Sequence, residues 1–206
     1  MIVRYLFGLA VCLLALNAFP AKPSSRHHAN GTEITTAEQM TQPLPPAYGY
    51  LLLDLDLGEA SPIITIREIV NKNKLSRLPP QLISLKNKGK NFLLLQQREG
   101  AYLIQNVNVP LFNLPHRITT DKSKRWRFSI QADKVNYIGR LSIDAERTKR
   151  IITVNYSNRL ATDLARIQET YTDLLKLYPL AANHGHPDAF YDYLLQLTNN
   201  SQSQAN

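Results

Sequence analysis

The basic side chains of this chain are densest in the stretch DKSKRWRFSIQ at residues 121–131. If this stretch is a strand, Trp126, Phe128 and Ile130 enter the core, whereas Arg125 and Arg127 stand outside. Guanidinium groups bind phosphate and carboxylate through paired hydrogen bonds. We therefore predict an anion-binding site made of four residues: Lys122, Lys124, Arg125 and Arg127. The alternative is that these charges only protect a sheet edge from pairing with other chains.

Two carboxylates alternate with leucines in YLLLDLDLG, which begins at Tyr50. Asp54 and Asp56 would share one strand face, about 7 Å apart by strand geometry. That arrangement is compatible with the paired carboxylates of acid–base catalysis. Alternation with core-facing leucines accounts for both residues without catalysis, so they fit the outer face of a half-buried strand.

A possible metal site occurs in NHGHPD, where His184, His186 and Asp188 could supply imidazole and carboxylate ligands. Ligands two residues apart in a loop lack the helical or strand spacing that fixes a metal site. An exposed turn, in which Pro187 starts the next helix, is the simpler interpretation. We predict no metal and no other cofactor.

The chain contains no common catalytic signature. It has no Gly-x-Ser-x-Gly elbow, no Gly-rich phosphate loop and no His-Glu-x-x-His helix. It is basic, with 24 Lys and Arg against 16 Asp and Glu, a net charge of +8. We therefore expect a non-enzymatic binding or accessory module whose partner is an anionic envelope polymer or another protein. The alternative is a periplasmic hydrolase or metal-dependent enzyme with an unrecognised site.

The N-terminal segment predicts export. One arginine precedes an apolar run over residues 5–16, which is shorter than the about 20 residues that a membrane-spanning helix needs. Candidate cleavage sites follow Ala18 and Ala21, so we expect a signal peptide at residues 1–21. The mature protein would be periplasmic or secreted, would not span a membrane and would not meet nucleic acid. Cys12 would leave with the signal peptide; the alternative is that it carries a lipid anchor.

Cys12 is the single cysteine of the chain. Without it, thiol catalysis, zinc–thiolate sites and disulfides are all excluded from the mature protein. A domain of about 150 residues can bury enough surface to fold without disulfides. This combination favours the bacterial periplasm.

The hydrophobic pattern divides the rest of the chain. Residues 22–47 are rich in Ser, Thr, His, Gln and Pro, which predicts a flexible linker. Residues 48–157 contain short runs of period two joined by turn-like segments. They predict a mainly β domain, an antiparallel β-sandwich of about eight strands. The eight runs begin at Tyr50, Ile63, Gln81, Asn91, Ala101, Trp126, Lys134 and Arg150.

One predicted strand, KVNYIGRLSI, carries a glycine. Alternation places the apolar residues on one face together with Gly139, and these residues are Val135, Tyr137, Leu141 and Ile143. A glycine there would let a neighbouring group approach closely. Tyr137 is either a core tyrosine whose hydroxyl finds a partner or a ligand contact.

Residues 158–198 predict two α-helices packed on the sandwich. The apolar stripe of the first helix is Leu160, Leu164, Ile167, Tyr171, Leu174 and Tyr178. Pro179 ends this helix, and a second begins near Pro187 and runs to about Leu197. The broad apolar arc of the second helix either fills a groove of its own protein or docks on another chain. Residues 199–206 are expected to be disordered.

Two stretches, REGAYLIQNV from Arg98 and ADKVNYIGRLSI from Ala132, carry a resemblance. A Gly-x-Tyr turn into a strand, followed later by a Tyr-Ile-Gly-x-Leu strand, resembles uncharacterised small exported bacterial proteins. The similarity covers about residues 50–179, including the closing LYP. It implies an immunoglobulin-like or transthyretin-like sandwich, and it implies no activity and no functional residue.

Overall fold

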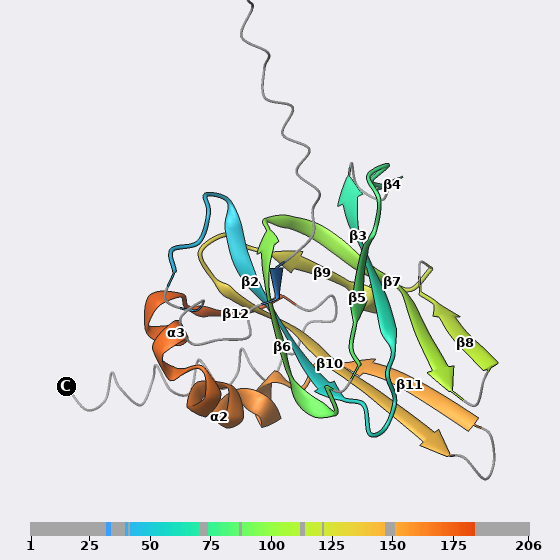
Figure 1. Ribbon diagram of the computed structural model, residues 1–206. Helices are drawn as coiled ribbons and strands as arrows, with labels where there is room; N and C mark the ends of the chain where they lie inside the picture. Colours follow the sequence, from blue (N-terminus) through green and yellow to red (C-terminus); the bar gives the residue numbers. More distant parts are fainter. Residues whose placement is uncertain are drawn as a thin grey trace, which may run out of the picture.

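Residues with alternating apolar side chains form two β-sheets in the computed structural model of the protein (Figure 1). The structure describes residues 32–33, 40, 42–70, 74–86, 88–111, 114–120, 122–146 and 151–183. The predicted signal peptide, second C-terminal helix and tail lie outside these residues, as does most of the predicted linker. None of the helices in the described part has the length and apolarity needed to cross a bilayer.

The bounds of the elements agree with most of the expected strands. The strands are β1 (Thr32–Glu33), β2 (Tyr48–Asp56), β3 (Ile63–Val70), β4 (Lys74–Leu75), β5 (Gln81–Ser84), β6 (Lys90–Arg98), β7 (Gly100–Leu111), β8 (Leu114–Thr119), β9 (Arg127–Ile130), β10 (Val135–Glu146), β11 (Ile151–Ser157) and β12 (Leu180–Ala182). The helical segments are η2 (Lys124–Trp126), α2 (Leu160–Thr170) and α3 (Thr172–Leu177).

Sheet A has the order β1-β6-β2-β10-β11, with β12 also beside β10. Sheet B has the order β4-β3-β7-β8, with β5 beside β3 and β9 beside β7. Sheet B is antiparallel, but in sheet A β10 runs parallel to both β2 and β12. The prediction of a wholly antiparallel fold is therefore wrong in sheet A. Every strand of sheet B lies between β2 and β10 in the chain, so no hairpin forces these two strands to be antiparallel.

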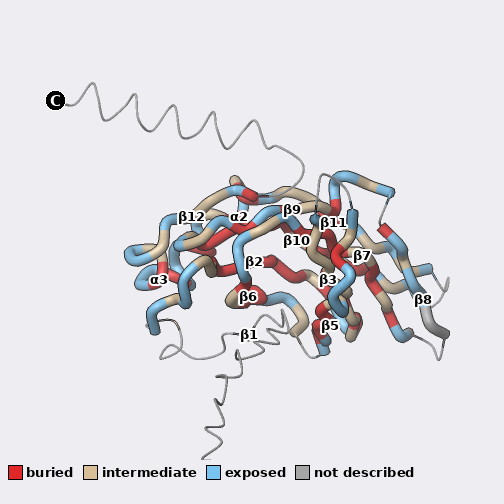
Figure 2. The backbone as a smooth tube through the Cα atoms, turned by 90° about the horizontal axis from the view of Figure 1, so that it is seen from above, coloured by how far each residue is buried: buried red, intermediate tan, exposed pale blue. Residues whose placement is uncertain are grey.

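The main core lies between the two sheets, because its buried residues come from both. It contains the leucines that were expected to share one face of β2 and the residue after it: Leu51, Leu53, Leu55 and Leu57. Ile64 and Ile66 of β3 and Ile104 of β7 meet them from sheet B. Figure 2 shows β2 in the middle of the molecule, buried along its length. The expected period of two is thus confirmed for this face of β2.

The opposite face of sheet A is covered by α2 and α3. Tyr50 and Leu52 of β2 lie in a second buried cluster, together with helix residues such as Ile167 and Leu174. β2 is therefore buried on both faces, and the expectation of a half-buried strand is wrong. The helical stripe itself is interrupted, because Tyr171 leaves helical geometry (φ −121°, ψ 31°) and divides the predicted single helix into α2 and α3.

Two strands of more than two residues were not expected from the sequence. β8 contains Pro115, which weakens the strand signal, but β8 is an edge strand and can accommodate a residue without an N–H. β12 has only three residues after Pro179, and it is defined by its pairing with Val135 to Tyr137 of β10.

Gly139 changes the face on which side chains of β10 lie. Tyr137 is opposite Leu52, whereas Gly139 is opposite Leu53, so the register shifts by one residue at this bulge. Gly139 has φ +128°, a conformation that side-chain-bearing residues rarely adopt. The expectation that all four apolar residues of β10 share one face is therefore wrong: Val135 and Tyr137 face the helices, and Leu141 and Ile143 face sheet B.

Candidate anion-binding surface

The predicted basic site begins in a turn that leaves sheet B. β8 and β9 both pair with β7, and the chain between them forms the 3₁₀ segment η2. Trp126 is buried at the end of η2 and stacks on Tyr156 of sheet A, with ring centroids 4.8 Å apart and planes inclined by 14°. Trp126 thus enters the core as predicted, although it lies in a 3₁₀ turn and not in the strand.

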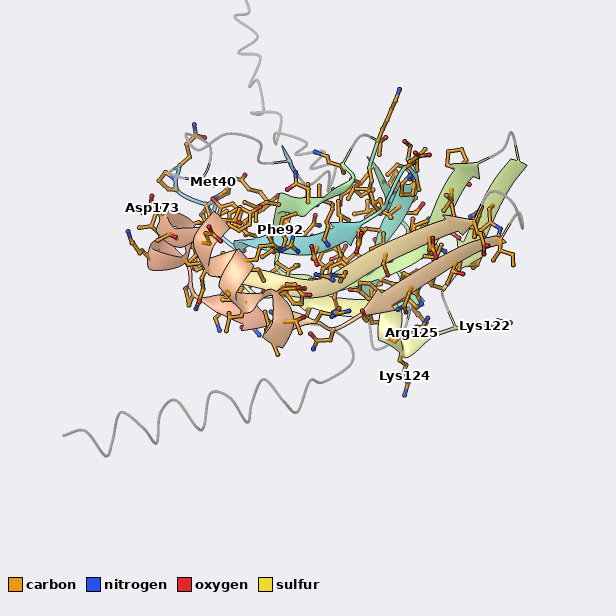
Figure 3. The ribbon with its side chains drawn as sticks, turned by 90° about the horizontal axis from the view of Figure 1, so that it is seen from below. Met40, Phe92, Lys122, Lys124, Arg125 and Asp173 are labelled. Carbon is orange, nitrogen blue, oxygen red and sulfur yellow. The ribbon has the colours of Figure 1, made fainter. Side chains whose placement is uncertain are left out.

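Three of the four predicted residues project from this turn into solvent: Lys122, Lys124 and Arg125. We call these three residues the basic turn. Figure 3 shows them together at the side of the molecule away from α2 and α3. The Arg125 guanidinium lies 5.8 Å from the centre of the Trp126 ring. A ligand bound by Arg125 would therefore lie close to the only tryptophan of the chain.

The fourth residue, Arg127, lies in β9 on the outer face of sheet B, the face that points away from sheet A. In the register of the sheet, Arg127 is opposite Leu103 of β7, and Leu103 is opposite Arg67 of β3. Directly opposed residues share a face. Arg117 of β8 lies on the same outer face, since it is opposite Asn108, and its Nε donates a hydrogen bond of 3.1 Å to Asn106 Oδ1.

We call the outer face with Arg67, Arg117 and Arg127 the arginine face. The remaining outward residues with described side chains in β3, β5, β7, β8 and β9 are uncharged: Ile63, Thr65, Ile69, Leu82, Ser84, Ala101, Leu103, Asn106, Asn108, Pro110, Thr119 and Ser129. Glu68 points to the opposite face, because it is opposite Tyr102 in the core. Within these described strands, the arginine face therefore carries positive charge and no carboxylate.

Arg67 and Arg117 were not identified from the sequence. The signal for Arg67 was present in IITIREI, where the period of two places this arginine opposite the core isoleucines. Arg117 lies two positions after Pro115 in a strand that was not expected, so its face could not be assigned. Only the pairing of β3, β7, β8 and β9 brings the three arginines onto one surface.

The two carboxylates of β2 have different surroundings. Asp54 is fully buried beneath α2 and forms ion pairs with Arg140 of β10 and Arg166 of α2. Arg140 also binds Asp163 of α2 at 2.5 Å. We call these four side chains the ion-pair network. Asp56 is only half-buried at the end of β2. Arg140 links Asp54 to Asp163 of α2, and not to Asp56.

Tyr137 completes the network by donating a hydrogen bond of 2.9 Å to Asp163 Oδ2. The hydroxyl of this fully buried residue thus has a partner, in agreement with a core tyrosine. Burial raises the pKa of Asp163, although Tyr137 and Arg140 act against this rise. Burial lowers the pKa of Arg140, but the hydrogen bond with Asp54 and the negative charges of Asp54 and Asp163 act together against it, and the net pKa is raised. Both carboxylates are occupied by cations, which suits a link between α2 and sheet A better than proton transfer.

No protein-family model matches the chain, and no curated protein is significantly similar to it.

The described residues contain no group of three or more His, Cys, Asp or Glu side chains that could hold a metal. The predicted candidate ligands His184, His186 and Asp188 lie outside the described residues. A hollow of about 20 Å³ beside Gln81, Gln97 and Tyr102 has room for about one water.

Proposed function

We propose that the protein is an exported, non-enzymatic binding module that holds an anionic polymer of the cell envelope. One observation carries this proposal: three exposed cations gather on a single turn, anchored by the buried Trp126 and continuous in sequence with Arg127. The predicted signal peptide and the resemblance to small exported bacterial proteins support a periplasmic location. If these charges only protect a sheet edge from pairing with other chains, no anionic polymer should bind at this turn.

The test is a titration of the mature protein with sodium alginate and with sodium polyphosphate, followed by Trp126 fluorescence. We expect a change in emission that added NaCl suppresses, because contacts between exposed charges are screened. Replacing Lys122, Lys124 and Arg125 together by Ser should weaken binding about tenfold, as three exposed contacts of about 0.5 kcal/mol each would require.

The matched control replaces three exposed lysines elsewhere, Lys74, Lys86 and Lys90, by Ser and changes the net charge equally. This control should bind nearly as well as the parent. Equal weakening in both variants would mean that net charge alone attracts the polymer. If neither polymer binds the parent, the proposed function is wrong.

A further inference from the structure

The hollow of about 20 Å³ lies between the two sheets, near the hairpin that joins β6 to β7. Gln97 of β6 borders it from sheet A, and Glu68 of β3 and Tyr102 of β7 border it from sheet B. Gln97 is two positions after Leu95, a residue of the main core, so alternation directs its side chain into the space between the sheets. A group bound in the hollow would therefore contact both sheets.

Gln97 brings a buried hydrogen-bond acceptor to the hollow. The residue is only 2 % exposed, and its Oε1 has no donor among the described residues. Its side chain forms a hydrogen bond with Tyr102, whose hydroxyl in turn donates one of 2.8 Å to the backbone oxygen of Arg98. A buried acceptor without a donor is destabilising, and native structures rarely keep one without a reason. A ligand that donates a hydrogen bond in the hollow would satisfy it.

Glu68 supplies a negative charge beside this acceptor. It is half-buried and lies opposite Tyr102, on the same face of sheet B. Burial raises the pKa of Tyr102, and its hydrogen bond with Gln97 acts against that rise. The negative charge of Glu68 raises this pKa further, more than the exposed Arg98 lowers it. Arg67 also borders the hollow, but alternation directs its side chain to the other face of β3. The side chains that enter the hollow thus favour a cation over an anion.

The rim of the hollow is apolar and exposed. It includes Leu78, which is 52 % exposed, and Pro79. The Ser76 backbone N–H donates a hydrogen bond of 2.8 Å to the backbone oxygen of Glu68, and the Leu78 N–H donates one of 3.2 Å to Ser76 Oγ. These bonds tie the rim to β3. An exposed leucine is ordinary by itself, but beside the hollow it offers a surface to the methylene groups of a ligand.

We propose that this hollow binds a primary alkylammonium group, which donates a hydrogen bond to Gln97 Oε1 and lies beside the Glu68 carboxylate. The alkyl chain of the ligand leaves the hollow across Leu78 and Pro79. An ammonium group has three donors and no acceptor, which suits a site that offers an acceptor and a negative charge. It is also about as large as the one water for which the hollow has room. This inference goes beyond the proposed function, because it concerns a cationic ligand and none of the residues of the basic turn.

The test is a titration of the ¹⁵N-labelled mature protein with n-butylammonium chloride at constant ionic strength, followed by amide chemical shifts. We expect saturable shifts at Gln97 and in residues 66–68 and 76–79, which border the hollow. The neutral probe n-butanol has the same alkyl chain and a polar end of similar size. It should bind about tenfold or more weakly, because it brings no charge to Glu68 and no charge-assisted hydrogen bond to Gln97.

Three variants assign the contacts. Gln97→Leu should weaken n-butylammonium binding about tenfold or more, because it removes the acceptor of a hydrogen bond from a charged group. Glu68→Gln should weaken it about threefold, as expected for a partly exposed ion pair. Glu169→Gln is the matched control: it removes an exposed carboxylate from α2 and should bind like the parent.

The inference is wrong if the parent shows no saturable shifts with n-butylammonium, if n-butanol binds as tightly, or if Glu68→Gln binds like the parent. Melting temperatures of the variants within a few degrees of the parent exclude misfolding as the cause of lost binding. If Gln97→Leu melts much lower than the parent, Glu68→Gln and the comparison of the two probes decide the question. None of these results bears on polymer binding at the basic turn, so the two proposals can fail separately.

Discussion

At the scale of single residues, the ion-pair network buries charged side chains between sheet A and α2. Asp54 has no exposed surface, and its two oxygens contact guanidinium groups from β10 and α2. A buried pair gains little net stability over apolar packing, but removal of one partner leaves an uncompensated charge. Arg166 moderates that cost, because it is 35 % exposed and stacks on Phe92 at 4.1 Å.

Asp54→Ala should therefore lower the free energy of unfolding by about 2–4 kcal/mol, measured by urea denaturation. Asp56→Ala is the matched control two residues along the same strand, and it should change the free energy by less than about 1 kcal/mol because Asp56 is half-buried and outside the ion-pair network. Similar losses in the two variants would show that the network does not hold α2 on sheet A.

At the scale of elements, the bulge at Gly139 decides what α2 can bind. Before the bulge, Tyr137 faces the helix layer, and after it Arg140 takes the position opposite Asp54 on that same side. An unbroken alternation of two would keep position 139 on the helix side and turn Arg140 toward the apolar core between the sheets. The bulge thus allows β10 to supply both an apolar contact and a cation to α2.

Gly139→Ala should destabilise the protein by about 1–3 kcal/mol, because φ +128° is strained for a residue with a Cβ. The loss should not be additive with that of Asp54→Ala, since a distorted bulge already misplaces Arg140. A double-mutant cycle in urea measures this coupling. Additive losses within about 0.5 kcal/mol would mean that the bulge and the network are independent.

At the scale of the whole molecule, the helix layer and the proposed binding surface are separate. α2 and α3 cover one face of sheet A, whereas the basic turn and the arginine face belong to sheet B and its edge (Figures 1 and 3). Charge changes on the binding surface are therefore expected to leave the ion-pair network intact, which allows affinity and stability to be varied independently.

The predicted export of the protein also concerns the whole chain. Intact-mass analysis of periplasmic protein should show a chain that begins near Phe19 or Lys22 and carries no lipid, as expected for cleavage after Ala18 or Ala21. Cys12→Ser should leave the mature mass unchanged. A mature chain that begins at Cys12 with an added diacylglycerol would instead establish a lipoprotein.

The sequence by itself determined most of the segments that form strands and, where no bulge intervenes, which residues of a strand share a face, because both depend on neighbours two positions apart. Leu51, Leu53 and Leu55 in β2 and the inward position of Trp126 were predictable in this way. The break in the helix at Tyr171 was not, because the apolar stripe continues through it. Of the proposed binding surface, the basic turn and Arg127 could be identified from local charge density alone.

The tertiary structure decided which segments become neighbours. The partners of Asp54 are 86 and 112 positions away in the chain, so no local pattern reveals that this carboxylate is buried between two cations. The same holds for Arg67, which meets Arg127 only because β3 and β9 take opposite sides of β7. Alternation in the sequence specifies the face of a strand on which a side chain lies. What that face contacts is determined by strand pairing, by the bulge at Gly139 and by the helices that cover sheet A. These three features depend on burial summed over the whole chain.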